Sequence, residues 1–276
     1  RYDRMDEYVK LCCELWDSWA PDAVVADKES GVFADPDKVK IINHDGKFFK
    51  CKGRHFCAPS PQGRPVFWQA GSSPRGRDFA AETAEAVFAV HPSVERMREY
   101  ADDLQERARK FNRPDGSMKL IYGVQTVVAA TREEAQAKYE RIVSCIPLEG
   151  ALAWMSGHFG LENVRNLEVP GIQGLFESII YAKDPKGELP VTVREAAMIY
   201  AQGMGMPVLI GTASDIADQL EIYMDEGGAD GFMLAATYTP GCFEEFVDHV
   251  VPELQRRGRY RTSYAGPTLR ENLLQE

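Results

Sequence analysis

The sequence predicts an α/β fold built around a parallel β-sheet. From residue 65 onward, short apolar segments alternate with longer segments whose apolar residues recur at helical spacing, and this alternation is typical of βα units. Four apolar segments have the length of parallel strands, whereas a complete TIM (β/α)8 barrel needs eight strands and about 250 residues. We therefore expect the C-terminal half of such a barrel, within a single domain over residues 1–276. A doubly wound open sheet is the alternative.

The first 64 residues predict a helix and a surface hairpin. Apolar side chains recur at helical spacing from Asp3 to Trp19. An insertion over residues 21–64 follows, in which strands at 39–43 and 47–51 flank His44, Asp45 and Gly46. An Asp-Gly pair between two strands favours a hairpin. The chain opens inside the helical pattern without an initiator methionine, so we expect a fragment of a longer protein.

The rest of the chain predicts βα units and a second insertion. Strands are expected at 66–70, 86–90, 120–128 and 230–235, and helices at 76–84, 92–111, 132–145, 192–202, 216–226 and 241–258. Residues 147–191 are rich in glycine and proline and show no clear period, which is typical of a functional loop. With the helix that follows, they form an insertion over 147–206 that we expect at the active site. Arg256 and Arg257 are interpreted as a solvated basic patch.

The composition narrows the class of protein. Hydrophobic residues make up 44% of the chain and charged residues 27%, the balance of a soluble globular protein. The net charge of −10 argues against nucleic acid as a partner, and no apolar run approaches the roughly 20 residues of a membrane span. The six cysteines form no Cys-x-x-Cys pair, so we interpret them as reduced thiols of a cytoplasmic protein. The five scattered histidines indicate no metal site.

The junction between the strand at 66–70 and the helix after it is the strongest candidate for a binding site. Gln69, Ala70 and Gly71 end the strand, and Ser72 and Ser73 open the helix. Backbone N–H groups and two hydroxyls at a helix N-terminus suit an anion, most often a phosphate. A capped turn without a ligand is the alternative, since the segment has neither the P-loop lysine nor the glycine spacing of a dinucleotide fingerprint.

Several stretches of the chain agree, in order, with one enzyme family. They are residues 1–4, 15–19, 31–36, 69–88, 211–232, 251–258 and 268–271, with the run Gln69-Ala70-Gly71-Ser72-Ser73-Pro74-Arg75-Gly76 as the most informative. Together they resemble the bacterial-luciferase-like monooxygenases, and within them the branch of nitrilotriacetate and dibenzothiophene-sulfone monooxygenases. The resemblance covers nearly the whole chain, and no single motif carries it.

The resemblance implies the C-terminal half, with insertions, of a luciferase-like TIM barrel and an enzyme that uses FMN as FMNH2. A separate NAD(P)H:flavin reductase would supply the FMNH2, O2 would be the co-substrate, and a C4a-peroxyflavin would oxygenate a small organic substrate. The full-length protein is expected to form a homo-oligomer. Two alternatives stay open: a non-catalytic flavin-binding fragment or partner subunit, and a deazaflavin-dependent oxidoreductase of the same superfamily.

The resemblance also implies which residues contact the flavin phosphate. Ser72 and Ser73 would donate hydrogen bonds to it, with residues 69–71 beside them at the C-terminal end of a barrel strand, where TIM-barrel sites form. Arg1 and Tyr2 match a pair that contacts the same phosphate, and an arginine suits that contact as a permanently charged, multidentate donor. A frayed terminal pair is the alternative for Arg1 and Tyr2.

His158 is the candidate catalytic residue. It lies in the expected loop over the active-site mouth, where a histidine could hydrogen-bond a flavin peroxide or act as an acid–base group near neutral pH. A solvated loop histidine is the alternative. The other histidines are interpreted as surface or structural residues: His44, His55, His91 and His249.

Overall fold

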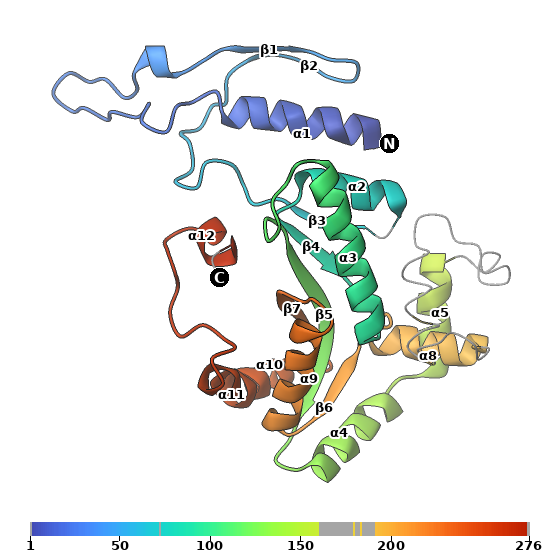
Figure 1. Cartoon of the computed structure of the whole chain (residues 1–276). Coiled ribbons are helices and arrows are strands. Elements are labelled where there is room, and N and C mark those ends of the chain that lie inside the picture. Colours follow the sequence, from blue (N-terminus) through green and yellow to red (C-terminus); the bar gives the residue numbers. More distant parts are fainter. Residues whose placement is uncertain (1, 72, 160–178, 180–182, 184–190, 275–276) are drawn as a thin grey trace. The chain divides into compact units, whose positions relative to one another are not determined.

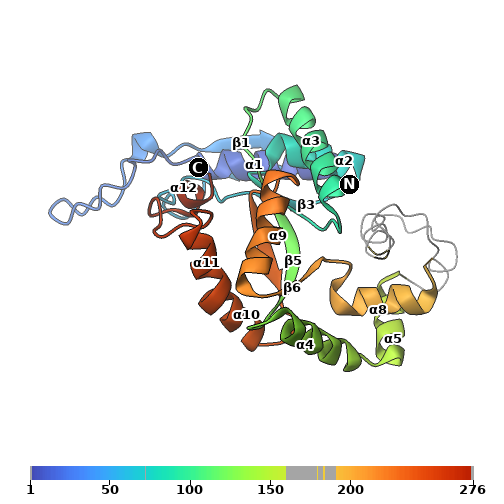
Figure 2. The same cartoon turned by 60° about the horizontal axis from the view of Figure 1, so that its bottom comes forward.

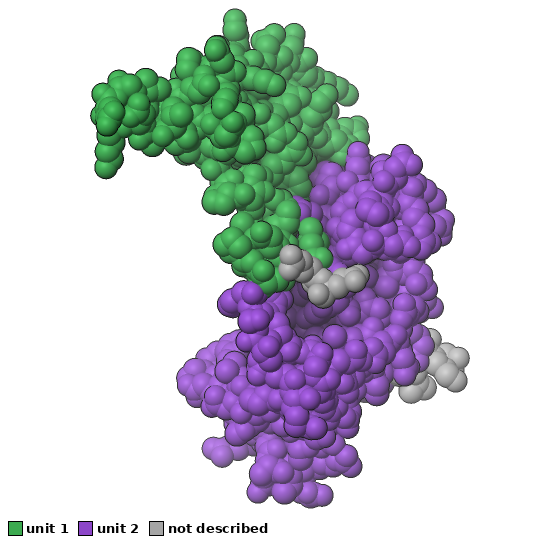
Figure 3. Space-filling view, turned by 60° about the vertical axis from the view of Figure 1, so that its left-hand side comes forward, with its two compact units in different colours: residues 1–67, 265–276 green, residues 68–264 purple. Residues whose placement is uncertain are grey.

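The computed structural model describes residues 2–71, 73–159, 179, 183 and 191–274. Its internal contacts divide the chain into two compact units, which Figure 3 shows in green and purple. Unit 1 comprises residues 1–67 and 265–276, and unit 2 comprises residues 68–264. The single domain over 1–276 stays a prediction.

A five-stranded parallel sheet forms the frame of unit 2 (Figure 1). Its strands are β3 (Trp68–Ala70), β4 (Ala86–Ala89), β5 (Lys119–Val128), β6 (Val208–Gly211) and β7 (Gly231–Ala235). β4 and β7 pair with opposite edges of β5, because both take Ile121 and Tyr122 as partners. β6 lies on the edge opposite β7, because Gln125 pairs with both of these strands. The predicted parallel α/β fold is confirmed.

The sequence pattern misses one strand of this sheet, β6. A four-residue apolar run between two helices is too short to show a period, so the sequence pattern does not identify it as a strand. Its last residue, Gly211, has a φ of 152°, in a region that favours glycine. Thr212 then caps the next helix in a reciprocal capping box with Asp215.

Three helices cover one face of the sheet. They are α2 (Pro74–Thr83), α3 (Val94–Lys110) and α9 (Ala213–Asp225), and Figure 1 shows α3 and α9 in front of the strands. Alternate residues of β5 turn to these helices: Leu120 and Tyr122 pack with α2 and α3, and Val124 packs with α9. A further helix, α4 (Arg132–Ser144), follows β5 as expected, with Thr131 as its cap. No helix among the described residues has the length and apolar character needed to cross a membrane.

The segment expected as a long loop contains a helix. α5 spans Leu148–Phe159 and packs against α8 (Val193–Gly203), and the two lie beside each other in Figure 2. Ala151, Met155 and Tyr200 belong to the buried cluster between them. The expectation of a loop is therefore wrong for residues 148–159, because burial against α8 stabilises a helix whose own glycines weaken its local signal. Residues 160–178 lie outside the described residues.

The last helix of unit 2, expected as one element, has three parts. α10 (Gly241–Glu245) runs into the π-helical segment η2 (Phe246–Val250) and then into α11 (Val251–Arg256). Pro252 lies in the first turn of α11, and a proline has no N–H to donate to the carbonyl four residues earlier. The wider π turn directly before Pro252 accommodates that missing bond.

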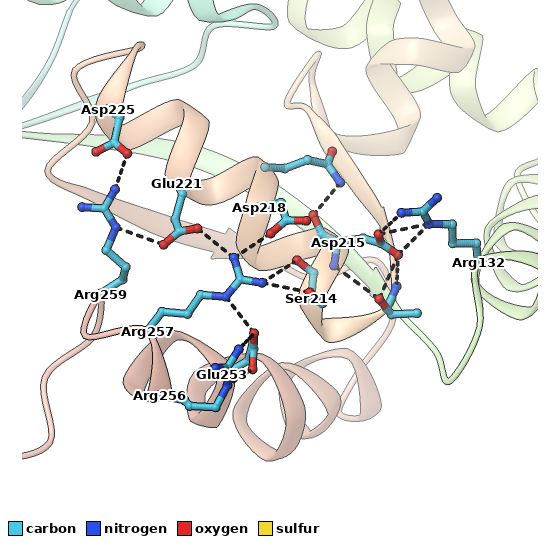
Figure 4. Close-up of polar contacts among 12 residues, drawn as sticks. Arg132, Ser214, Asp215, Asp218, Glu221, Asp225, Glu253, Arg256, Arg257 and Arg259 are labelled. Atoms are coloured by element: carbon cyan, nitrogen blue, oxygen red, sulfur yellow. Dashed lines mark hydrogen bonds and ion pairs between the residues drawn. The ribbon is translucent and has the colours of Figure 1, made fainter.

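Arg257 ties this last helix to α9 (Figure 4). Its guanidinium pairs with carboxylates at 2.6–2.7 Å on both elements, Glu253 on one side and Asp218 and Glu221 on the other. Only 15% of its side chain is exposed. The hydrogen bonds from Arg256 and Arg257 lower the pKa of Glu253 to about 2. The interpretation of a solvated basic patch is therefore wrong for Arg257, whose partners on α9 precede it by 36 and 39 positions.

Unit 1 contains a helix that supports a hairpin. Its elements are α1 (Tyr2–Trp16), the 3-10 turn η1 (Pro36–Lys38), β1 (Ile42–Asp45), β2 (Lys50–Gly53) and α12 (Leu269–Leu274). β1 and β2 pair antiparallel, so the expected hairpin is confirmed. Its strands lie later in the sequence than expected, and His44 and Asp45 belong to β1. The carboxylate of Glu7 in α1 accepts the N–H groups of Phe48 and Phe49 at 2.9 and 2.7 Å, which fixes the turn there instead.

His44 lies between two glutamates of α1. Its Nδ1 is 2.9 Å from Glu14 Oε2 and its Nε2 is 3.5 Å from Glu7 Oε1, and 7% of its side chain is exposed. The hydrogen bond with Glu14 raises the pKa of His44 above its ordinary value against the opposing effect of burial, and Glu7 adds to the rise. When it is protonated, His44 forms ion pairs that hold the hairpin to α1.

We expect Arg257→Met to lower the free energy of unfolding by about 1–2 kcal/mol, because it leaves partly buried carboxylates without their cation. The matched control is Arg256→Met, whose side chain is 70% exposed and pairs with Glu253 in the same turn; exposed pairs contribute little. Urea denaturation followed by circular dichroism measures both variants. Equal losses for the two arginines would contradict a special role for Arg257.

We expect the hairpin to open more readily as pH rises. A histidine with a raised folded-state pKa stabilises the fold fully below its unfolded-state pKa of about 6.5, and the contribution is lost as pH rises through the folded-state value. Hydrogen exchange of residues 42–53, corrected for intrinsic rates, should therefore accelerate above pH 6.5. His44→Gln should remove this pH dependence. The control is His55→Gln, because the His55 ring contacts the carbonyl of Cys57 rather than α1. This variant should retain the pH dependence.

Candidate functional site

The strand-to-helix junction forms a short turn at the edge of the sheet. β3 ends at Ala70 and α2 begins at Pro74, so residues 71–73 connect them. Ser73 is the N-cap: its backbone is extended and its Oγ accepts the N–H of Gly76 at 3.2 Å. Pro74 in the first helical turn lacks an N–H that would need a partner. The predicted junction is confirmed, and Ser72 lies outside the described residues.

The cap leaves the Ser73 hydroxyl able to donate. A serine hydroxyl has one proton and two lone pairs, and the bond from Gly76 occupies one lone pair. The proton can still be donated to an anion in front of the helix, where the N-terminal end of the helix dipole is positive. Capping and anion binding are therefore compatible at this serine.

Gly71 and Gln69 lie side by side at the start of the turn. A Cβ built on Gly71 would be 3.4 Å from Gln69 Nε2 and 3.6 Å from Gly76 Cα, which is ordinary van der Waals contact. The packing of the turn therefore does not require a glycine at position 71. The contacts of Gln69, Ala70 and Gly71 with a flavin cofactor stay predictions.

The segment after β4 leaves the sheet beside this turn, at the carboxyl ends of the strands. Ala70 of β3 pairs with Phe88 of β4 in parallel, so both strands end together. His91 follows β4, and its ring centre lies 4.8 Å from that of Tyr100 on α3. Burial, together with the charges of the nearby Arg77 and Arg96, lowers the pKa of His91 to about 4. His91 is therefore neutral near pH 7.

α3 contacts the turn through polar side chains. The Tyr100 hydroxyl donates to the carbonyl of Gly71 at 2.9 Å, and the guanidinium of Arg77 lies 4.8 Å from the centre of the Tyr100 ring. Arg77 also pairs with Asp103 at 2.9 Å. Sequence reasoning missed these residues, because Tyr100 matches the apolar face of a helix and its partner is 29 positions away.

His158 lies on helix α5 rather than in a loop. Its side chain is exposed, its Nδ1 is 2.9 Å from the hydroxyl of Tyr200 on α8, and the ring of Trp154 is also nearby. Burial raises the pKa of Tyr200, so its hydroxyl stays protonated and can donate to Nδ1, which leaves the proton of a neutral imidazole on Nε2. The loop placement is wrong, and these contacts join His158 to α8 rather than to the turn after β3.

The other predicted residues are divided between unit 1 and the undescribed positions. Tyr2 is the first residue of α1, and Arg1 lies outside the described residues. Their contact with a phosphate stays a prediction. In the described part of the chain, no three side chains of His, Cys, Asp or Glu gather as ligands for a metal ion.

Comparison with known proteins places the chain in a family. The family model of luciferase-like monooxygenases matches residues 1–230. The chain is 40% identical to the dimethyl-sulfide monooxygenase of Hyphomicrobium sulfonivorans, over 99% of this chain and 58% of that protein. It is 35% identical to the nitrilotriacetate monooxygenase component A of Aminobacter aminovorans, over 99% of this chain and 62% of that protein. The chain thus spans about three fifths of the length of these relatives.

A solved structure agrees with the fold as well. The crystal structure of a riboflavin lyase with modified FMN and its substrate riboflavin is similar to this chain with a TM-score of 0.86 and 32% identity. The match covers 99% of this chain and 61% of that one. The resemblance expected from the sequence is confirmed, and so is the luciferase-like type of TIM-barrel fold. The chain belongs to the luciferase-like monooxygenase family.

Proposed function

We propose that this chain is part of a flavin-dependent monooxygenase and that the turn after β3 binds the phosphate of FMN. The observation that supports this most directly is Ser73, which caps α2 and still has a hydroxyl proton to donate. A helix N-terminus at the carboxyl end of a parallel strand is where phosphates of cofactors bind. The similar riboflavin lyase is described with modified FMN, which favours FMN as the ligand.

Residues of the turn would bind and orient the cofactor. Ser73 would donate to a phosphate oxygen, the helix dipole would stabilise its charge, and residues 69–71 would lie beside the cofactor at the end of β3. Reduced FMN supplies the electrons that activate O2 for oxygenation of a small organic substrate. His158 would donate a hydrogen bond from Nε2 or exchange a proton near neutral pH, with Tyr200 holding its Nδ1.

We further propose that FMNH2 comes from a separate NAD(P)H:flavin reductase. The name of the nitrilotriacetate relative, component A, indicates an enzyme of more than one component. The related enzymes are named for different small organic substrates, so a substrate of that class is proposed. The whole protein is expected to be a cytoplasmic homo-oligomer.

The substitution Ser73→Ala tests whether the Ser73 hydroxyl binds the phosphate of FMN. We expect FMN to bind about 1–2 kcal/mol more weakly, the size of one charge-assisted hydrogen bond, as measured by quenching of flavin fluorescence. Thr131→Ala is the matched control, because Thr131 also caps a helix, α4, and accepts an N–H at 3.2 Å. Unchanged FMN affinity in Ser73→Ala, or the same loss in both variants, would contradict the assignment. FMN binding without NADH- and reductase-dependent oxygenation would favour a non-catalytic flavin-binding role.

We expect His158→Ala to lower turnover of the intact, reductase-coupled enzyme by at least about 100-fold, the usual scale of acid–base catalysis. FMN affinity should not change, because the described contacts of His158 reach α5 and α8. His249→Ala, at an exposed histidine of the π-helical segment η2, is the control for removal of an imidazole. Full activity of His158→Ala would show that His158 is a solvated residue.

A further inference from the structure

We infer that Tyr100 is a positioning residue for the cofactor: its hydroxyl holds the turn after β3 in the shape that receives a phosphate. The inference rests on the proposed FMN site. Tyr100 belongs to a polar ridge on α3, made of Tyr100, Asp103 and Arg107. Their spacing of three and four residues places them on one face of the helix.

The ridge contacts the turn and the first part of α2 at successive points. Tyr100 donates to the Gly71 carbonyl at 2.9 Å. Asp103 pairs with Arg77 and also with Arg107, each at 2.9 Å. Arg107 in turn reaches the carbonyl of Pro74 at 3.4 Å and the carboxylate of Asp78 at 2.5 Å.

Among the residues of this ridge, Tyr100 is the one that contacts the turn after β3, at Gly71. Its side chain is 2% exposed, and His91 and Arg77 pack against its ring, each 4.8 Å from the ring centre. Burial raises the pKa of Tyr100 to about 12, so the hydroxyl remains a donor throughout the physiological range. Because the ring is held between these neighbours, its hydroxyl holds the Gly71 carbonyl at the end of β3. A Gly71 carbonyl that is already held lowers the cost of ordering this position when an anion binds.

Tyr122 provides a matched comparison within the same cluster. It is fully buried on β5, its ring centre lies 5.9 Å from that of His91, and its hydroxyl donates to a backbone carbonyl at 2.8 Å. That carbonyl belongs to Met97 of α3 rather than to the turn. Replacing either tyrosine by phenylalanine removes one buried hydroxyl–carbonyl hydrogen bond, but only Tyr100→Phe releases Gly71.

The experiment compares FMN with riboflavin, which lacks the phosphate, in the wild-type chain and in both variants. Dissociation constants are measured by flavin fluorescence, with riboflavin titrated in competition with FMN so that one shared site is followed. In Tyr100→Phe we expect FMN to bind about three- to tenfold more weakly, the range for one hydrogen bond, with riboflavin unchanged. In Tyr122→Phe both affinities should match the wild type, although thermal stability falls as in Tyr100→Phe.

Other outcomes separate the inference from the proposed function. If Ser73→Ala weakens FMN selectively but Tyr100→Phe does not, the phosphate site stands and the positioning role of Tyr100 is overturned. Equal weakening of FMN and riboflavin in Tyr100→Phe, or the same FMN loss in Tyr122→Phe, also overturns it, because either result indicates general destabilisation. If the wild-type chain binds FMN no better than riboflavin and Ser73→Ala has no effect, the proposed phosphate site fails, and the inference fails with it.

Discussion

The fold of unit 2 depends on the pairing of β5. This ten-residue strand is buried along nearly its whole length, and β4, β6 and β7 all hydrogen-bond to it. Its alternate residues Leu120, Tyr122 and Val124 pack against the helices. A slip of one residue would turn these side chains to the opposite face, so burial fixes the register of β5. That register in turn fixes where each neighbouring strand ends.

The location of the candidate site follows from these strand ends. Since β3 and β4 are parallel and in register, the turn after Ala70 and the segment that carries His91 leave the sheet at the same edge. α3 then returns along the sheet and brings Tyr100 to the Gly71 carbonyl. Aspartates balance the charges of Arg77 and Arg107 near this end of the sheet. His91 is neutral near pH 7. In the proposed phosphate site, Ser73 and the N-terminus of α2 would therefore supply the attraction for the anion.

Two charged side chains outside the site show why partners across the fold are hard to predict. Arg257 and His44 each look exposed in sequence, one near a helix end and one beside an Asp-Gly pair. In the structure both are largely buried, and carboxylates on other elements of the same unit pair with them. Local patterns carry information over a few residues, whereas these ion pairs span 30 to 39 positions.

The sequence by itself determined the parallel α/β class, the family, the hairpin and the junction at Ser73, because each depends on periodicity, on turn chemistry or on motifs that are read locally. Only the tertiary structure decided that His158 lies on a helix, that β6 joins the sheet, and that Tyr100 holds Gly71. In each of these cases the deciding energy is burial or hydrogen bonding between segments far apart in the chain. Helix α5 forms despite its internal glycines because α8 packs against it. The Tyr100 hydroxyl donates to the Gly71 carbonyl because α3 brings it to the end of β3.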